Sequence, residues 1–328
     1  PLYLGTVSAS ARSENVPVTV FALYACGRYA SMKEKGKHAE ARRIAEEAVR
    51  DMATYGLIDA NAENLSFSSD SRQNPFYTQA TSTSWQDLRS NASIVMYMNA
   101  YEDPRRASYF SKSGYDGIYV GVRAGIQNVT PTDYATYSYP LFAEKDPVPV
   151  MYASESWFLR AEGALLGWTM GDTAENLYNT GVKTSLELWG NGSSYETYIA
   201  SETAPALSYA DPRNKHNVSD FGTAVSVKWA DDGNELERII TQKWIANHMI
   251  GHEAWADVRR TGYPRLLQVV NNLSGGMWGN VDSSKGMRRL HYPQSEYDNN
   301  RENVLGGIQL LGGPDEYSTD VWWAKKQN

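Results

Sequence analysis

Two histidines four positions apart are the residues of this chain that most directly suggest metal chemistry. His248 and His252 have the spacing that places two metal ligands on one face of a helix. Gly251 interrupts that face, and the His-Glu-x-x-His order of zinc peptidases is absent. The acidic run 231–235 could hold calcium, but it lacks the spacing of a calcium loop and reads as a turn. We therefore expect solvated histidines at a helix end, no metal and no cofactor.

Four carboxylates on predicted helices could supply the acid and the base of a glycoside hydrolase, a mechanism that needs two converging carboxyl groups. They are Glu155, Glu162, Glu253 and Asp257. Arginines lie close to two of them in the sequence, so buried ion pairs between helices are the expected role. The sequence contains no nucleophile elbow, P-loop or dinucleotide fingerprint. We expect no enzyme, and an α-helical glycoside hydrolase stays open as the alternative.

Aromatic side chains are the second candidate for chemistry, because 10 Trp and 22 Tyr outnumber 7 Phe. An aromatic ring beside amides and carboxylates complements both the C–H face and the hydroxyl rim of a sugar. We predict glycan stacking by Trp85, Tyr77, Tyr115 and Tyr119, and further by Phe76, Tyr101 and Tyr109. The polar neighbours predicted to bind hydroxyls are Asn74, Asp87 and Asp116. Packing of the same rings on the scaffold is the alternative.

The composition excludes other classes of protein. A net charge of -7 argues against a nucleic-acid-binding surface, which needs clustered Lys and Arg. The single cysteine, Cys26, lies in an apolar run and is expected to be a small buried hydrophobe. No run of 18 apolar residues occurs, so we expect no segment that spans a membrane.

Helical hairpins must position these candidate residues. Apolar residues at helical spacing predict hairpins over 17–55, 152–189 and 235–260. Small residues recur at the spacing of a tetratricopeptide-type repeat, where they let two helices approach closely. We therefore predict an all-α fold of tetratricopeptide-like hairpins with long irregular loop insertions.

The segments between the hairpins are rich in turn-forming residues. Residues 57–150 form a loop-rich insertion with a helix near 86–101 and a short strand pair around 117–122. Residues 190–234 are again loop-rich, and residues 262–328 form an irregular C-terminal segment with one short helix at 301–311. We expect all of them to belong to a single domain, 1–328.

Four stretches of the sequence together resemble the C-terminal two-thirds of a SusD/RagB-type protein. They are 45–49 with 56–64; Asp103-Pro104-Arg105; 155–164 with 177–182; and 242–245 with 253–264, followed by 292–303. The stretches occur in the order of the family and cover most of the chain. They belong to the scaffold, so the resemblance implies a fold and a role but no particular binding residue.

The resemblance implies a SusD-like fold and a non-catalytic glycan-binding lipoprotein on the outer-membrane surface of Bacteroidetes. Such proteins take part in polysaccharide uptake and present oligosaccharide to a SusC-like TonB-dependent transporter. The chain begins at Pro1 and is expected to lack the N-terminal part of the family, including its lipid-anchoring cysteine. Membrane contact would then occur only through an anchor not present in this chain. A peptide-binding member of the family and a protein-interaction scaffold remain alternatives.

Overall fold

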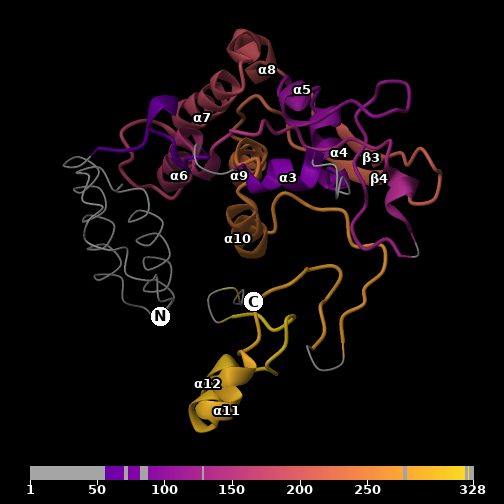
Figure 1. Cartoon of the computed structure of the whole chain (residues 1–328). Helices are drawn as coiled ribbons and strands as arrows, with labels where there is room; N and C mark the ends of the chain where they lie inside the picture. The colour runs from indigo at the N-terminus through magenta and orange to yellow at the C-terminus, as the bar shows by residue number, and fades with distance from the viewer. Residues whose placement is uncertain are drawn as a thin grey trace.

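The computed structural model describes residues 56–69, 73–81, 88–127, 129–275, 279–321 and 324. These residues form a helix-rich protein with two small two-stranded antiparallel sheets, which confirms the predicted helical fold class (Figure 1). The predicted hairpin over 17–55 and Cys26 lie outside the described residues.

The predicted hairpin over 152–189 is formed by helices α6 (Ala153–Leu165) and α7 (Ala174–Leu188). The Thr173 side chain accepts a hydrogen bond from the Asn176 amide at 3.2 Å, which caps the start of α7. A Cβ atom added at Gly181 would lie 3.0 Å from the Phe158 ring. The small residue at this position therefore allows the two helices to pack closely.

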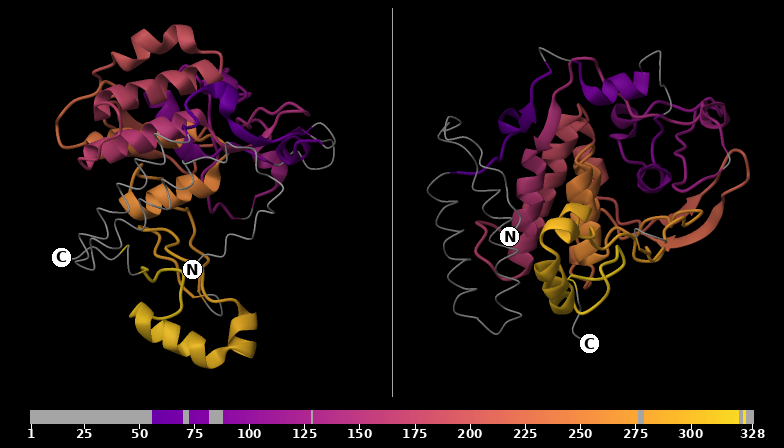
Figure 2. Two further views of the ribbon diagram at one scale, coloured as in Figure 1. Left: turned by 90° about the vertical axis from the view of Figure 1, so that its left-hand side faces the viewer. Right: turned by 60° about the horizontal axis from the view of Figure 1, so that its bottom comes forward.

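The hairpin predicted over 235–260 is formed by α9 (Glu235–Ala246) and α10 (Gly251–Thr261). Helix α9 packs against both α6 and α7. Helix α10 follows α9 in the chain and also contacts it (Figure 2). Gly262 ends α10 in the left-handed conformation with φ 83°, which a residue with a Cβ atom rarely adopts. We call these four helices, α6, α7, α9 and α10, the helical frame.

The insertion between the hairpins contains more regular structure than its composition predicts. It holds η1 (Asn61–Glu63), β1 (Leu65–Phe67), α3 (Pro75–Thr81), α4 (Ala92–Ala100), α5 (Arg106–Tyr109), η2 (Pro131–Tyr134) and β2 (Val148–Met151). Strands β1 and β2 pair, and Asn91 caps α4 through the Ser93 amide. Helix α4 is the helix predicted near 86–101.

The predicted strand pair around 117–122 is wrong. Among the described residues, this segment makes only an isolated bridge between Val122 and Asn91. Its backbone groups bond instead to two separate loops, because Val122 donates to the Ser90 carbonyl and Ser138 donates to the Val120 carbonyl. The segment is a loop fixed from both sides and contains no hairpin.

A β-hairpin was missed in the segment 190–234. After η3 (Gly192–Ser194) and α8 (Tyr195–Ile199), strands β3 (Ala206–Tyr209) and β4 (Val218–Thr223) pair antiparallel. The Asp211 side chain holds the loop between them by accepting hydrogen bonds from the backbone amides of residues 213, 215 and 216. This anchoring carboxylate explains how so polar a loop stays ordered.

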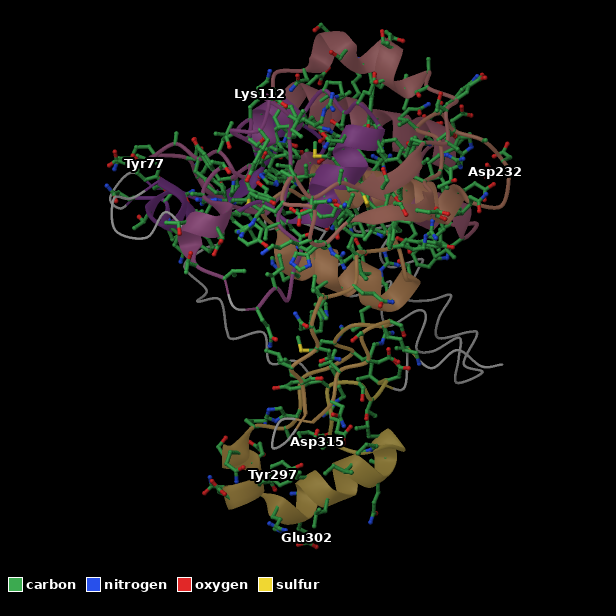
Figure 3. The ribbon with its side chains drawn as sticks, turned by 90° about the vertical axis from the view of Figure 1, so that its right-hand side faces the viewer. Tyr77, Lys112, Asp232, Tyr297, Glu302 and Asp315 are labelled. Atoms are coloured by element: carbon green, nitrogen blue, oxygen red, sulfur yellow. The ribbon has the colours of Figure 1, made fainter. Side chains whose placement is uncertain are left out.

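The C-terminal segment carries α11 (Gln294–Asn299) and α12 (Arg301–Leu311), so the helix predicted at 301–311 is confirmed. Figures 1 and 3 show both helices projecting from the rest of the protein. Asp315 ties this unit together, since it accepts hydrogen bonds from the Tyr297 hydroxyl and the Tyr292 amide. No helix in the described part of the chain has the length and apolar character needed to cross a membrane.

Candidate functional site

The carboxylates considered for acid–base catalysis hold the helical frame together. Lys243 on α9 lies 3.2 Å from Glu155 on α6 and 3.0 Å from Asp257 on α10, and all three side chains are buried. Burial alone would lower the pKa of Lys243, but the two carboxylates raise it above its ordinary value. Glu162 pairs with Arg260, which also contacts Asp257. The predicted ion pairs between helices are therefore confirmed for Glu155, Glu162 and Asp257, whereas Glu253 lies beside His252 of its own helix.

The histidine prediction needs correction. His248 is buried, and its ring stacks on Tyr109 with 4.1 Å between the ring centroids. Burial lowers the pKa of His248 to about 3, so the ring is neutral at ordinary pH. His252 is exposed as predicted. The described residues contain no group of three or more His, Cys, Asp or Glu side chains able to hold a metal ion.

Three of the predicted sugar-binding residues are buried, which corrects their assignment. The Tyr109 ring has no exposed surface because His248 and Trp189 pack against it. Tyr101 donates its hydroxyl hydrogen bond to the Val225 carbonyl. The Asn74 side chain accepts hydrogen bonds from the amides of residues 76 and 77 at the start of α3. None of the three side chains can contact a ligand at the surface.

The remaining predicted residues occupy two different elements. Phe76 and Tyr77 lie on α3, where Phe76 stacks on Phe142 at 5.5 Å. Tyr115, Asp116 and Tyr119 lie in the loop 113–121, where Asp116 is exposed at a turn. Trp85 and Asp87 lie outside the described residues.

Tyr119 lines a pocket of about 380 Å³, which we call the Tyr119 pocket. Asn99 on α4 donates a 2.9 Å hydrogen bond to the Tyr119 carbonyl and thereby fixes the position of that residue. Arg106 donates to the Asn99 side chain at 3.3 Å, and its guanidinium lies 5.7 Å from the centre of the Tyr119 ring. Ile118, Ser208 and Tyr209 complete much of the wall. The pocket therefore combines an aromatic ring with a cation, an amide and a hydroxyl.

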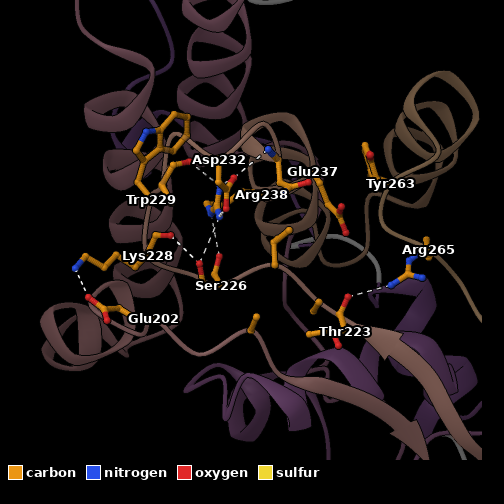
Figure 4. Close-up of a pocket in the computed structure, with 15 residues that line it drawn as sticks. Glu202, Thr223, Ser226, Lys228, Trp229, Asp232, Glu237, Arg238, Tyr263 and Arg265 are labelled. Atoms are coloured by element: carbon orange, nitrogen blue, oxygen red, sulfur yellow. Dashed lines mark hydrogen bonds and ion pairs between the residues drawn. The ribbon is translucent and has the colours of Figure 1, made fainter.

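A larger cavity of about 780 Å³ lies between the first turn of α9 and the loops that flank it (Figure 4). We call it the Trp229 pocket. Its charged lining residues are Glu202, Lys228, Asp232, Glu237, Arg238 and Arg265, and its aromatic ones are Trp229 and Tyr263. A volume of this size is ordinary for a small-molecule site.

The Trp229 indole is held in place by its neighbours. Its ring nitrogen donates a 2.9 Å hydrogen bond to Asp231, and its ring packs against Tyr178 with 5.4 Å between centroids. The stacking rings predicted from the sequence all lie in the insertion 57–150, so Trp229 is not among them. A tryptophan followed at once by a polar turn, as in 229–234, is the signal that could have found it.

Comparison with known proteins assigns most of the chain to one family. A family model described as SusD-like, SusD and RagB outer membrane lipoprotein, matches residues 28–324. No curated protein sequence matches the chain.

Solved structures give a consistent result. A SusD homologue from Bacteroides thetaiotaomicron is 39% identical with a TM-score of 0.81, and the match covers 94% of this chain and 65% of that protein. A SusD homologue from Bacteroides uniformis is 40% identical, with a TM-score of 0.81 and coverage of 94% and 64%. A chitin-binding SusD homologue from Flavobacterium johnsoniae is 37% identical, with a TM-score of 0.81 and coverage of 94% and 63%. The chain thus spans slightly less than two thirds of these relatives.

Proposed function

Because the chain belongs to the SusD-like family of outer membrane lipoproteins, we propose that it is a non-catalytic glycan-binding protein of the cell surface. In this role it would present oligosaccharide to a SusC-like TonB-dependent transporter. The family match and the placement of Tyr119 support the proposal.

The geometry of the Tyr119 pocket is the observation that carries glycan binding. A sugar offers an apolar C–H face to a ring and hydroxyl groups to polar neighbours. Tyr119 is partly exposed and is accompanied by Arg106 and Asn99, and Tyr115 and Asp116 lie in the same loop. One ring contributes roughly 1 kcal/mol beyond its buried area, so binding to a single unit would be weak, in the high-micromolar to millimolar range.

The arrangement of the carboxylates supports a binding role over hydrolysis. A glycoside hydrolase needs two carboxyl groups on either side of the bond that it cleaves. Glu155 and Asp257 are buried around Lys243, and Glu162 is held by Arg260. These side chains form ion pairs within the helical frame and do not face a common cleft.

A glycan panel followed by one matched pair of variants tests the proposal. We expect a neutral oligosaccharide to bind, and chitooligosaccharides are the first probes because one similar protein is described as chitin-binding. Tyr119→Ala should lower the affinity about five- to tenfold through the lost ring contact. Tyr195 is the matched control, since it is also a partly exposed tyrosine with a cation, Lys183, 5.8 Å from its ring centre.

The outcomes separate the alternatives. Unchanged binding after Tyr119→Ala would remove the site assignment, and release of shorter products from the bound glycan would favour the hydrolase. Binding of peptides but of no glycan would indicate a peptide-binding member of the family. Co-purification with a co-expressed SusC-like transporter tests the proposed partner. If the two proteins do not co-purify in detergent, that part of the proposal is contradicted.

A further inference from the structure

The Trp229 pocket contains a carboxylate that the described part of the protein leaves without a hydrogen-bond partner. Glu237 lies in the first turn of α9 and lines the cavity. Figure 4 shows its side chain extending into the space between Arg238 and Tyr263. Partial burial raises its pKa, which indicates that water solvates the carboxylate incompletely. A carboxylate in this setting needs hydrogen-bond donors from a ligand or from water.

The other charged groups of the pocket are already engaged. Lys228 pairs with Glu202, and Arg238 pairs with Asp232 at 3.1 Å. Arg265 donates to the Thr223 carbonyl at 3.0 Å and lies over the ring of Phe221. The cavity is therefore lined by fixed charges of both signs that compensate one another.

This charge balance narrows the class of ligand. Three acidic and three basic side chains line the cavity, so it offers no strong net attraction to an anion or to a cation. An ammonium group approaching Glu237 would also meet the positive charges of Arg238 and Arg265, which act on the same carboxylate. A neutral ligand rich in hydroxyl groups meets neither penalty and can donate to Glu237.

The apolar part of the lining suits a flat ring. Trp229 is held by Asp231 and Tyr178, so its indole is fixed before any ligand arrives. Several other wall residues are small or aliphatic, namely Ala204, Ala224, Val225 and Ala230. A fixed ring loses little conformational freedom on binding, which favours stacking of a sugar.

We propose that the Trp229 pocket is a second glycan site, which takes a neutral sugar unit whose neighbouring hydroxyls donate hydrogen bonds to Glu237 while the ring packs near Trp229. The inference rests on the proposed glycan-binding function and extends it. The two sites share no lining residue, since the Tyr119 pocket is built from α4, Arg106 at the start of α5, the loop 113–121 and residues 208–210. A polysaccharide could then be held at two points by one molecule.

Calorimetry with short probes tests this second site. Neutral chitotriose and maltotriose are compared with the cationic glucosamine trimer and the anionic galacturonate trimer. For a neutral trisaccharide that binds, we expect two sites per chain, and we expect Glu237→Gln to weaken one of them about tenfold while Tyr119→Ala weakens the other. Glu175, an exposed glutamate in the first turn of α7, provides the control Glu175→Gln.

A second readout reports on the pocket itself. The indole N–H resonance of Trp229, identified by its disappearance in Trp229→Phe, should shift when the neutral trisaccharide is added. Thermal unfolding of Glu237→Gln checks that the variant is folded, and the same resonance confirms that its pocket is intact.

Each result decides the question. One site per chain, sensitive to Tyr119→Ala alone, overturns the second site and leaves the proposed function in place. Preferred binding of a charged trimer at Glu237 overturns the assignment of a neutral ligand. No binding by any trisaccharide or longer glycan overturns the proposed function and this inference with it.

Discussion

The helical frame and the Trp229 pocket both contain ion pairs, but the pairs around Lys243 in the frame are buried and the Lys228–Glu202 pair of the pocket is exposed. In the frame, the Lys243 side chain is 1% exposed and lies between two buried carboxylates. In the pocket, Lys228 is 52% exposed and its partner Glu202 is 77% exposed. The first arrangement fixes three helices relative to one another. The second leaves Lys228 and Glu202 accessible to solvent and to a ligand, although the Arg238 side chain of the same pocket is only 1% exposed.

Helix α9 joins the two regions. Its first turn carries Glu237 and Arg238 at the pocket, and one turn further along it carries Gln242 and Lys243 in the frame. A helix held by buried ion pairs cannot easily shift, so the pocket residues at its start are positioned by the same packing. The comparison indicates that the buried ion pairs of the frame fix the position of the Trp229 pocket, while exposed charged side chains in the pocket can contact a ligand.

Removing the central charge of the frame should produce the largest effect. Lys243→Met leaves Glu155 buried and uncompensated and leaves Asp257 with Arg260 as its remaining partner, which costs about 3–5 kcal/mol of unfolding free energy. Urea unfolding followed by circular dichroism measures the loss. A change below about 1 kcal/mol would show that the buried pair does not hold the frame, and the comparison would fail.

Acid should affect the frame through His248. The buried ring stays neutral down to a pKa of about 3, whereas an unfolded chain protonates it near pH 6.5. The unfolded state therefore binds more protons as the pH falls from about 6.5 to 3, and stability is lost over that window at up to about 1.4 kcal/mol per pH unit. Above about pH 6.5 the group contributes no pH dependence.

The variant His248→Phe keeps a ring of similar shape that does not titrate. Between pH 6.5 and 5 it should therefore lose roughly 2 kcal/mol less unfolding free energy than the wild type, which appears as a flatter acid slope. Unfolding free energies at several pH values give the slope for each protein. His252→Gln on the exposed neighbour is the control and should leave the slope unchanged. Equal slopes for the wild type and His248→Phe would mean that the ring accepts a proton in the folded state.

A smaller effect is expected where the frame supports the pocket. The Tyr178 hydroxyl on α7 donates a 2.6 Å hydrogen bond to the Val227 carbonyl, in the loop that carries Trp229. Tyr178→Phe removes the donor and leaves a buried carbonyl unpaired, at a cost of about 1–2 kcal/mol. Thermal unfolding measures this loss, and the Trp229 indole resonance should broaden or shift. An unchanged resonance would separate the pocket from the frame.

Periodicity predicted the frame, because apolar spacing and small residues are local signals. The pattern of small side chains indicated close helix packing, and Gly181 against Phe158 shows why. The motif Asp103-Pro104-Arg105 supported the family resemblance, but its role was not visible in the sequence. Arg105 is buried and donates to Asp103, Ser185 and Gln242, residues from three parts of the chain.

The pockets could not be predicted in the same way, because burial of a loop ring depends on distant partners. Tyr109 and Tyr119 lie in similar polar surroundings in the sequence, yet one is enclosed by His248 and the other remains partly exposed. The contact that buries Tyr109 comes from a residue 139 positions later in the chain. The Trp229 pocket likewise combines the segments 202–204, 223–238 and 263–265.

The exposed pair of the Trp229 pocket should give the smallest effect on stability and so sharpens the comparison with Lys243. Lys228→Met removes the same type of charge by the same substitution, but both Lys228 and Glu202 are largely exposed. Water and salt screen such a pair, and removal leaves Glu202 solvated, so we expect a loss of less than about 1 kcal/mol in urea unfolding. High salt should abolish this small difference and should leave most of the Lys243→Met effect, because a buried pair is screened much less. If the two substitutions cost the same, accessibility would not be what distinguishes the regions, and the fixed positions of the pocket charges would have to come from the loop backbone.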